Sequence, residues 1–278
     1  MIADPRGPID YDEIGDGPTV VLVPGSCSTG AAWRPIITHL RGEFRCVTTS
    51  LLGYGGTAER RSRDDADIAA EADIVEGVIR HTGGPIHLVG HSFGGLSALA
   101  VAMRHPEWLL SLTMLEAPAI EVLRETGEDQ LYGEFRTMTG AYVGAYEAGD
   151  PHAIERMIDF YGGAGTFQSW PQRVRDYAVT TTPANLLDWT CAFGFALTPP
   201  SLAKVTTPTL VAWGESSHPA AKRANQLLGQ HIPKAAVAEM PGAAHFMIAT
   251  HPKQVADMIA QHIARADRRG RATELLLE

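Results

Sequence analysis

Short, unbroken runs of apolar residues alternate with segments of helical periodicity along the first part of the chain. The apolar runs are rich in β-branched residues and lie at 19–23, 45–51, 86–89 and 110–115. Between them, apolar residues recur at helical spacing at 31–40, 64–81 and 96–103. An unbroken apolar run is typical of a strand buried on both faces, and strands that alternate with helices are typical of a parallel sheet. We therefore predict an α/β fold, with a mostly parallel sheet and helices on both faces.

The alternation stops after residue 116. Residues 117–201 contain no convincing strand but several helical stretches, and they hold twelve of the twenty aromatic residues of the chain. This enrichment favours a helical insertion that lines an apolar cavity, although aromatic residues could equally form the core of a small helical unit. Strands are expected again at 209–214 and 235–240, and a last helix at 252–263 before a loosely held tail. We predict one core domain from residues 1–116 and 202–278, and an inserted helical domain at 117–201.

A serine between glycines follows one of the predicted strands. Residues 90–94 read Gly-His-Ser-Phe-Gly, with Ser92 at the centre, an apolar run before them and a predicted helix after them. This arrangement is typical of a nucleophile elbow, a tight strand–turn–helix that lifts a serine hydroxyl above the sheet. Neighbouring strands are expected to leave no room for side chains at Gly90 and Gly94. The alternative is an ordinary surface turn rich in small residues.

A serine hydroxyl needs a base to take its proton, and histidine is the natural base near neutral pH. The chain has eleven histidines. His245 stands in a small-residue loop after the last predicted strand, at the edge of the sheet where Ser92 is expected. His91 adjoins Ser92, but neighbours in a sharp turn point apart, so a structural role is expected. For His245 the alternative is a histidine on a surface loop.

Charge and cysteine content narrow the class of partner. The 278 residues have a formal net charge of −9, which argues against nucleic acid or an anionic membrane as partner. Three widely spaced cysteines form neither a disulfide framework nor a metal-binding pair, and Cys27 is expected to be a small apolar filler. The N-terminal residues contain no apolar signal segment. We expect a cytoplasmic protein that acts on a small molecule, without metal or cofactor.

The serine segment at 90–95 and the loop Pro-Gly-Ala-Ala-His-Phe at 241–246 together resemble the α/β-hydrolase superfamily of serine hydrolases. The likeness extends from about residue 9 to about residue 263, and segment 117–201 falls where that family inserts its cap domain. The resemblance implies Ser92 as nucleophile, His245 as general base, and the backbone N–H of Phe93 as one oxyanion donor. The second donor would be the N–H of Ser26, where this chain lacks the family's usual histidine.

The expected acid is missing from its usual place. Relatives commonly read Gly-x-x-Asp after the strand that ends near residue 213, whereas this chain reads Gly-Glu-Ser-Ser, with Ser217 in the place of the aspartate. Glu116 ends the strand that follows the elbow helix, where some relatives have their acid, and we prefer it. Glu215 could reach the histidine if its loop were reshaped. The third alternative is a site without an acid. In a purely structural interpretation, Glu116 would cap backbone N–H groups at the end of its strand.

The resemblance implies a cofactor-independent serine hydrolase that cleaves an ester or related acyl bond of a small to medium apolar substrate through an acyl-enzyme. One alternative is a carbon–carbon bond hydrolase, or a lyase that uses Ser92 and His245 without acylation. The other is a small-ligand-binding protein that has kept the pocket without catalysis, which the serine at position 217 makes worth considering.

Overall fold

A computed structural model of the chain describes the backbone of residues 1–274 and the side chains of residues 1–268. Seven strands form one sheet in the order β1-β3-β2-β4-β5-β6-β7, in which β1 is antiparallel to β3 and every other pair is parallel. The strands are β1 (Tyr11–Ile14), β2 (Thr19–Val23), β3 (Arg45–Thr49), β4 (Ile86–His91), β5 (Leu109–Leu115), β6 (Thr209–Gly214) and β7 (Ala236–Met240). The predicted fold class is confirmed.

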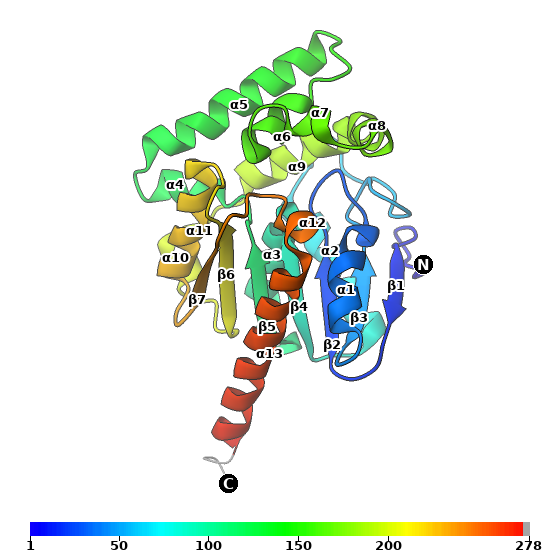
Figure 1. Cartoon of the computed structure of the whole chain (residues 1–278), viewed down its shortest axis with the longest axis vertical. Coiled ribbons are helices and arrows are strands. Elements are labelled where there is room, and N and C mark those ends of the chain that lie inside the picture. The colour runs from blue at the N-terminus through cyan, green and yellow to red at the C-terminus, as the bar shows by residue number, and fades with distance from the viewer. Residues whose placement is uncertain (275–278) are drawn as a thin grey trace.

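Both faces of the sheet are buried, as the unbroken apolar runs indicated. In β2, Val20 and Leu22 pack toward one face, and Val21 and Val23 pack toward the other. The first face is covered by α1 (Arg34–Leu40) and α13 (Pro252–Glu274), and the opposite face by α2 (Ile68–Thr82), α3 (Phe93–Arg104) and α11 (Pro219–His231) (Figure 1). A short helix, α12 (Met247–Thr250), precedes α13, and 3₁₀ turns span Gly30–Trp33 and Pro106–Trp108.

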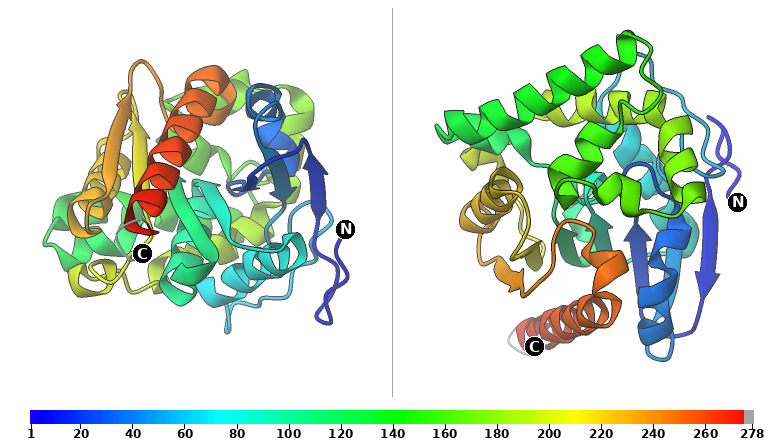
Figure 2. Two further views of the ribbon diagram at one scale, coloured as in Figure 1. Left: turned by 90° about the horizontal axis from the view of Figure 1, so that it is seen from below. Right: turned by 45° about the horizontal axis from the view of Figure 1, so that its top comes forward.

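Seven helices between β5 and β6 make up the segment for which an insertion was predicted. They are α4 (Ile120–Glu125), α5 (Asp129–Glu147), α6 (Glu155–Gly162), α7 (Thr166–Ser169), α8 (Gln172–Thr180), α9 (Thr182–Gly194) and α10 (Pro199–Leu202). Helices α5 to α9 lie together across the edge of the sheet at which its parallel strands end (Figures 1 and 2). These helices therefore lie over the carboxyl ends of the strands. The boundaries of a separate domain at 117 and 201 stay a prediction.

The last helix is longer than the sequence pattern indicated. The prediction placed its end near residue 263 and a loose tail after residue 266, but α13 continues to Glu274. Ile263 and Ala266 are both buried, so the apolar face of the helix extends beyond the expected end. The prediction was wrong because it ended the helix where the strongest apolar positions end.

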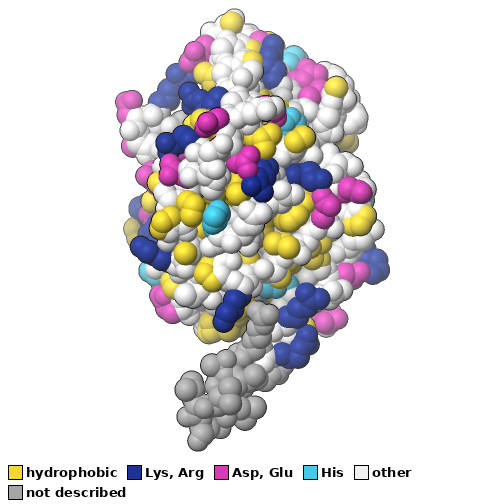
Figure 3. Space-filling model, turned by 90° about the vertical axis from the view of Figure 1, so that its left-hand side faces the viewer, with side chains coloured by type: hydrophobic (Ala, Val, Ile, Leu, Met, Phe, Trp, Pro, Cys, Tyr) yellow, Lys and Arg dark blue, Asp and Glu magenta, His cyan; other side chains and the backbone are white. Residues whose placement is uncertain are grey.

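The face of the molecule drawn in Figure 3 carries charges of both signs. On the side that faces the viewer in Figure 3, Lys and Arg side chains are interspersed with Asp and Glu rather than gathered in one patch. Among the described residues, no helix combines the length and the apolar character needed to cross a membrane.

Candidate active site

Ser92 sits at the turn between β4 and α3 in a backbone conformation that is rare for a residue with a side chain, with φ 52° and ψ −128°. Its N–H donates to the carbonyl of Leu115 at the end of β5, at 2.8 Å. Two glycines make the turn possible. A Cβ at Gly94 would lie 2.3 Å from the carbonyl oxygen of Pro24, directly after the end of β2. The neighbouring strand therefore leaves no room for a side chain at Gly94, as predicted.

Gly90 is restricted by a different neighbour from the one expected. A Cβ at Gly90 would lie 2.3 Å from the carbonyl oxygen of Gly94 and 2.6 Å from Cα of Gly95. The obstacle is therefore the first turn of the following helix and not an adjacent strand. The close approach of α3 to the strand that precedes it keeps the turn tight and Ser92 at its tip.

The imidazole of His245 contacts two side chains that follow the ends of neighbouring strands. His245 follows β7 in the loop 241–246, and its Nε2 lies 3.0 Å from Oγ of Ser92. Its Nδ1 lies 2.9 Å from Oε2 of Glu116, the residue directly after β5. His245 and Glu116 are 2% and 1% exposed, so this pair is shielded from water. The structure therefore brings together Ser92, His245 and Glu116, which the sequence singled out.

Glu116 is held by groups on either side of it. Its second oxygen, Oε1, accepts the N–H of Gly214 at 2.7 Å. Burial opposes ionisation of this carboxyl, but His245, the Ser217 hydroxyl and the Gly214 N–H outweigh burial and lower its pKa below the ordinary value. An ionised Glu116 accepts the Nδ1–H of His245, which leaves Nε2 as the acceptor for the Ser92 hydroxyl.

Glu215, the other candidate acid, lies elsewhere. Its side chain is exposed, and Oε2 accepts the N–H of Gly242 at 2.8 Å. Glu215 therefore fixes the start of the loop that carries His245 without contacting the imidazole. Ser217, in the usual aspartate position, is buried beside Gly214.

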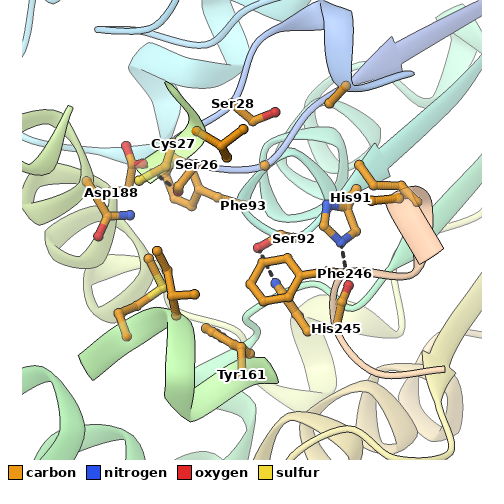
Figure 4. Close-up of a pocket in the computed structure, with 18 of the residues that line it drawn as sticks. Ser26, Cys27, Ser28, His91, Ser92, Phe93, Tyr161, Asp188, His245 and Phe246 are labelled. Carbon is orange, nitrogen blue, oxygen red and sulfur yellow. Dashed lines mark hydrogen bonds between the residues drawn. The ribbon is translucent and has the colours of Figure 1, made fainter. Parts of the chain in front are cut away.

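His91 contacts the backbone of His245. Burial, together with the neighbouring His245, lowers the pKa of His91 to about 3, so its ring is neutral at physiological pH. Its Nε2 lies 2.8 Å from the carbonyl oxygen of His245, which can only accept, so Nε2–H is the donor (Figure 4). The structural role expected for His91 is the positioning of the loop that carries the other histidine.

The two predicted oxyanion donors belong to segments that adjoin Ser92. Phe93 is the first residue of α3, so its N–H has no acceptor within the helix and lies at the positive end of the helix dipole. The loop that contains Ser26 passes directly over the serine, because a Cβ at Gly25 would lie 2.8 Å from Cβ of Ser92. The segments that carry both predicted oxyanion donors therefore flank the serine.

A cavity of about 440 Å³ opens above Ser92. It is lined mainly by apolar side chains, and the segment after β5 contributes Met157, Ile158, Tyr161, Trp170, Val174, Trp189 and Ala192. The Tyr161 ring stacks on His245 with centroids 4.0 Å apart. The aromatic enrichment of segment 117–201 thus reflects both possibilities raised from the sequence, since its aromatic residues line the cavity and also pack among themselves.

Asp188 is a cavity residue that the sequence reasoning missed. It lies on α9 beside Ser26 and Cys27, across the cavity from His245 (Figure 4). Its Oδ2 accepts the hydroxyls of Ser26 and Tyr54, each at 2.6 Å. No local motif marks such a residue, because its position depends on how the inserted helices fold over the sheet. Burial raises the pKa of the Cys27 thiol to about 12, which agrees with its expected role as a filler.

The described residues contain no group of three or more histidine, cysteine, aspartate or glutamate side chains placed to hold a metal ion. The three described cysteines, Cys27, Cys46 and Cys191, are free thiols.

Known proteins resemble the chain over most of its length. The sequence model described as "Alpha/beta hydrolase family" matches residues 20–258. Over 275 residues the chain is 23% identical to the pimeloyl-[acyl-carrier protein] methyl ester esterase of Aeromonas hydrophila, covering 92% of this chain and 99% of that one. It is 24% identical over 255 residues to the 2-(acetamidomethylene)succinate hydrolase of Mesorhizobium japonicum, covering 88% and 87%. The structure of a Thermogutta terrifontis esterase with malate bound superimposes with a TM-score of 0.72 and 22% identity over 93% of both chains.

Proposed function

The chain belongs to the alpha/beta hydrolase family, and on that premise we propose that it is a serine hydrolase that cleaves an ester or related acyl bond. The observation that supports this most strongly is the hydrogen-bonded series from Ser92 Oγ through His245 to the Glu116 carboxylate, with distances of 3.0 and 2.9 Å. A nucleophile, a base and a group that orients the base are what acyl transfer needs.

In the first half of the proposed reaction, Ser92 Oγ attacks the carbonyl carbon while its proton moves to Nε2 of His245. The carbonyl oxygen becomes an oxyanion, and the N–H groups of Phe93 and Ser26 stabilise it. Glu116 stabilises the imidazolium that forms, through the Nδ1–H hydrogen bond. When the tetrahedral intermediate collapses, the bond to the leaving oxygen breaks. That oxygen takes the proton from Nε2 and departs as an alcohol, which leaves an acyl group on Ser92.

In the second half, water replaces the alcohol. His245 Nε2 takes a proton from water as the water oxygen attacks the acyl carbon, and the same backbone donors stabilise the second oxyanion. Collapse breaks the bond to Ser92 Oγ, which recovers its proton from His245. The sum of the two halves is an ester and water converted to an acid and an alcohol, with the enzyme regenerated.

The cavity supports a small to medium and largely apolar substrate. Its volume of about 440 Å³ suits a small molecule, and its lining is dominated by aliphatic and aromatic side chains. An esterase and a hydrolase among the relatives agree with cleavage by water. A carbon–carbon bond hydrolase or a lyase would use the same serine and histidine, and no feature of the cavity favours either of them over ester hydrolysis.

The non-catalytic alternative loses its main support. The sequence feature that supports it is the serine at position 217, which leaves the usual place of the acid without a carboxylate. Glu116 comes from the neighbouring strand and makes that contact. A protein that only binds ligands has no need of a buried carboxylate against the base.

A panel of p-nitrophenyl esters of increasing acyl length tests the proposal. We expect wild type to release p-nitrophenol catalytically, and Ser92→Ala to lose at least about 10³-fold in kcat/KM. Ser97→Ala is the matched control, because Ser97 lies one turn further along α3 and its hydroxyl donates to the Phe93 carbonyl within the helix. Full activity in Ser92→Ala, or no hydrolysis of any ester by a folded wild type, would contradict the proposed function.

A further inference from the structure

We propose that the end of the cavity formed by α9 is a subsite for a hydrogen-bond-donating group of the substrate, an O–H or an N–H, and that this subsite excludes carboxylates. The inference rests on the proposed function, because it assumes that the group belongs to a molecule whose acyl carbon reaches Ser92. It goes further by stating which substituent that molecule bears.

One face of α9 supplies this end of the cavity. Asn185, Asp188, Trp189 and Ala192 follow the i, i+3, i+4, i+7 spacing of one helix face, and all four line the cavity. Asn185 and Asp188 are 1% and 2% exposed. Two strongly polar side chains buried in a mainly apolar lining need partners, because an unsatisfied buried polar group is costly.

Asp188 retains room for one more donor. Its carboxylate accepts hydrogen bonds from Ser26, from Tyr54 and, at 2.9 Å, from Nη1 of Arg61. A carboxylate offers about four acceptor positions, and these donors occupy three of them. A substrate O–H or N–H in the cavity can take the position that remains.

The charge around Asp188 favours a donor over an anion. Nη2 of Arg61 lies 2.7 Å from Oε2 of Glu59. Nη1 of the same guanidinium lies 2.7 Å from Oε1 of Glu71 and 2.9 Å from Oδ1 of Asp188. One positive charge therefore faces three carboxyl groups. Burial raises the pKa of Glu71 to about 8 and that of Asp188 above its ordinary value. With one cation among three carboxyl groups, the cluster disfavours a further anion beside Asp188 and favours a neutral N–H or O–H donor.

Two unpartnered groups point to the same conclusion independently. Within the described part of the chain, Oδ1 of Asn185 and the hydroxyl of Tyr161 are buried and have no hydrogen-bond partner. Both residues line the cavity, and the Tyr161 ring stacks on the imidazole of His245. Unsatisfied groups of this kind are what a bound polar substituent would complete.

The lining offers no permanently charged cation to neutralise a substrate carboxylate. All of the residues around the cavity are described, and none of them is lysine or arginine. Arg61 itself is 7% exposed and is engaged by its three acidic neighbours. A carboxylate at the α9 end would meet Asp188 without a counter-charge, and like charges at close range are strongly unfavourable there.

The test uses three series of p-nitrophenyl esters with acyl chains of matched length that end in a primary amide, a carboxylate or a methyl group. An amide and a carboxylate have nearly the same shape but differ in donors and charge. At the chain length that reaches α9, we expect wild-type kcat/KM for the amide to exceed that for the carboxylate by at least about tenfold. Equal values at every chain length would overturn the inference.

Two variants separate recognition from a merely structural role. Asp188→Asn keeps the shape and removes the charge, so the amide-to-carboxylate ratio should fall toward one. If Asp188 only holds the Ser26 loop, all three series lose activity by the same factor and the ratio is unchanged, which contradicts the inference. Asn185→Leu should lower the amide-to-methyl ratio, and it gives the answer even if Asp188→Asn does not fold.

Two controls complete the design. Thr190→Val changes an exposed residue on α9 and should leave both ratios at the wild-type value. Ser92→Ala, assayed with the methyl series, reports on the proposed function separately. If Ser92→Ala is inactive and the wild-type amide-to-carboxylate and amide-to-methyl ratios are close to one at every chain length, the subsite inference fails while serine hydrolysis stands. If Ser92→Ala is fully active, the proposed function fails first.

Discussion

Oε2 of Glu116 lies 2.9 Å from Nδ1 of His245, although Glu116 follows β5 and His245 follows β7. The strand between them, β6, also contributes, because the N–H of Gly214 at its end donates to the other oxygen of Glu116. The position where an aspartate was expected after β6 is occupied by Ser217. The carboxylate thus comes from the neighbouring strand, and the backbone at the end of β6 helps to hold it.

This arrangement makes a prediction about the acid. Glu116→Gln preserves shape but cannot stabilise an imidazolium, so kcat/KM should fall by about 10³- to 10⁴-fold, as for the corresponding change in another serine hydrolase triad. The matched control is Glu215→Gln, whose exposed side chain accepts the N–H of Gly242 in the loop, and it should stay within about threefold of wild type. Ester hydrolysis by purified variants measures both. A large loss in Glu215→Gln with little change in Glu116→Gln would reverse the assignment.

The predicted role of the Ser26 N–H as an oxyanion donor can be tested through the backbone. Ser26→Ala removes the hydroxyl that bonds Asp188 but keeps the N–H, whereas Ser26→Pro removes the N–H as well. Loss of one oxyanion donor costs about 10²- to 10³-fold in kcat. We therefore expect Ser26→Pro to lose that factor relative to Ser26→Ala, measured on the same ester after both variants are shown to be folded. Equal kcat in the two folded variants would remove Ser26 from the oxyanion site.

The tight turn at the serine predicts a steric effect on stability. Gly94→Ala would place a Cβ against the backbone of Pro24, which cannot move aside as a side chain can. We expect a loss of about 3 kcal/mol or more in the free energy of unfolding, measured by denaturant titration. Gly144→Ala is the control, because it lies in α5 with open space around the added methyl group. That variant should be neutral or up to about 1 kcal/mol more stable.

His91 predicts the pH dependence of stability. Its pKa is about 3 in the folded protein against an ordinary 6.5, so below pH 6.5 the unfolded chain binds more protons than the native one. The stability contributed by the neutral, buried His91 is therefore fully present above pH 6.5. As pH falls from 6.5 toward 3, the free energy of unfolding decreases by up to about 1.4 kcal/mol per pH unit. His91→Gln keeps a donor for the His245 carbonyl but does not titrate. Unfolding free energies measured from pH 7 to 4 should therefore fall less steeply in the variant, and parallel curves would contradict the role of His91.

The parts of the site that could be read from the sequence are those fixed by local geometry. Ser92 is marked by the glycines around it, whose side-chain-free positions the turn requires, and His245 by a small-residue loop directly after a strand. Ends of parallel strands meet at one edge, so placing both residues there followed from the order of elements. Glu116 became a candidate because it ends a strand at which some members of the resembled family have their acid, but only the fold could show that its carboxylate reaches His245.

Asp188 and Tyr161 could not be predicted, because no local pattern says which face of an inserted helix turns toward the strand ends. Asn185, Asp188, Trp189 and Ala192 share a helical face, yet the same spacing would serve a helix packed on its neighbours. The end of α13 was missed for a related reason. Its later turns bury small residues such as Ala266, which contribute little to an apolar pattern.

The central claim, that Ser92 becomes acylated, is tested most directly by mass spectrometry after reaction with a carbamate ester such as p-nitrophenyl dimethylcarbamate. Carbamoyl groups leave serine slowly, so the intermediate accumulates. We predict release of about one p-nitrophenol per protein chain and a carbamoyl mass on the peptide that contains Ser92, both absent in Ser92→Ala. An unmodified Ser92 peptide in a protein that still hydrolyses esters, or a label on a different residue, would contradict the account.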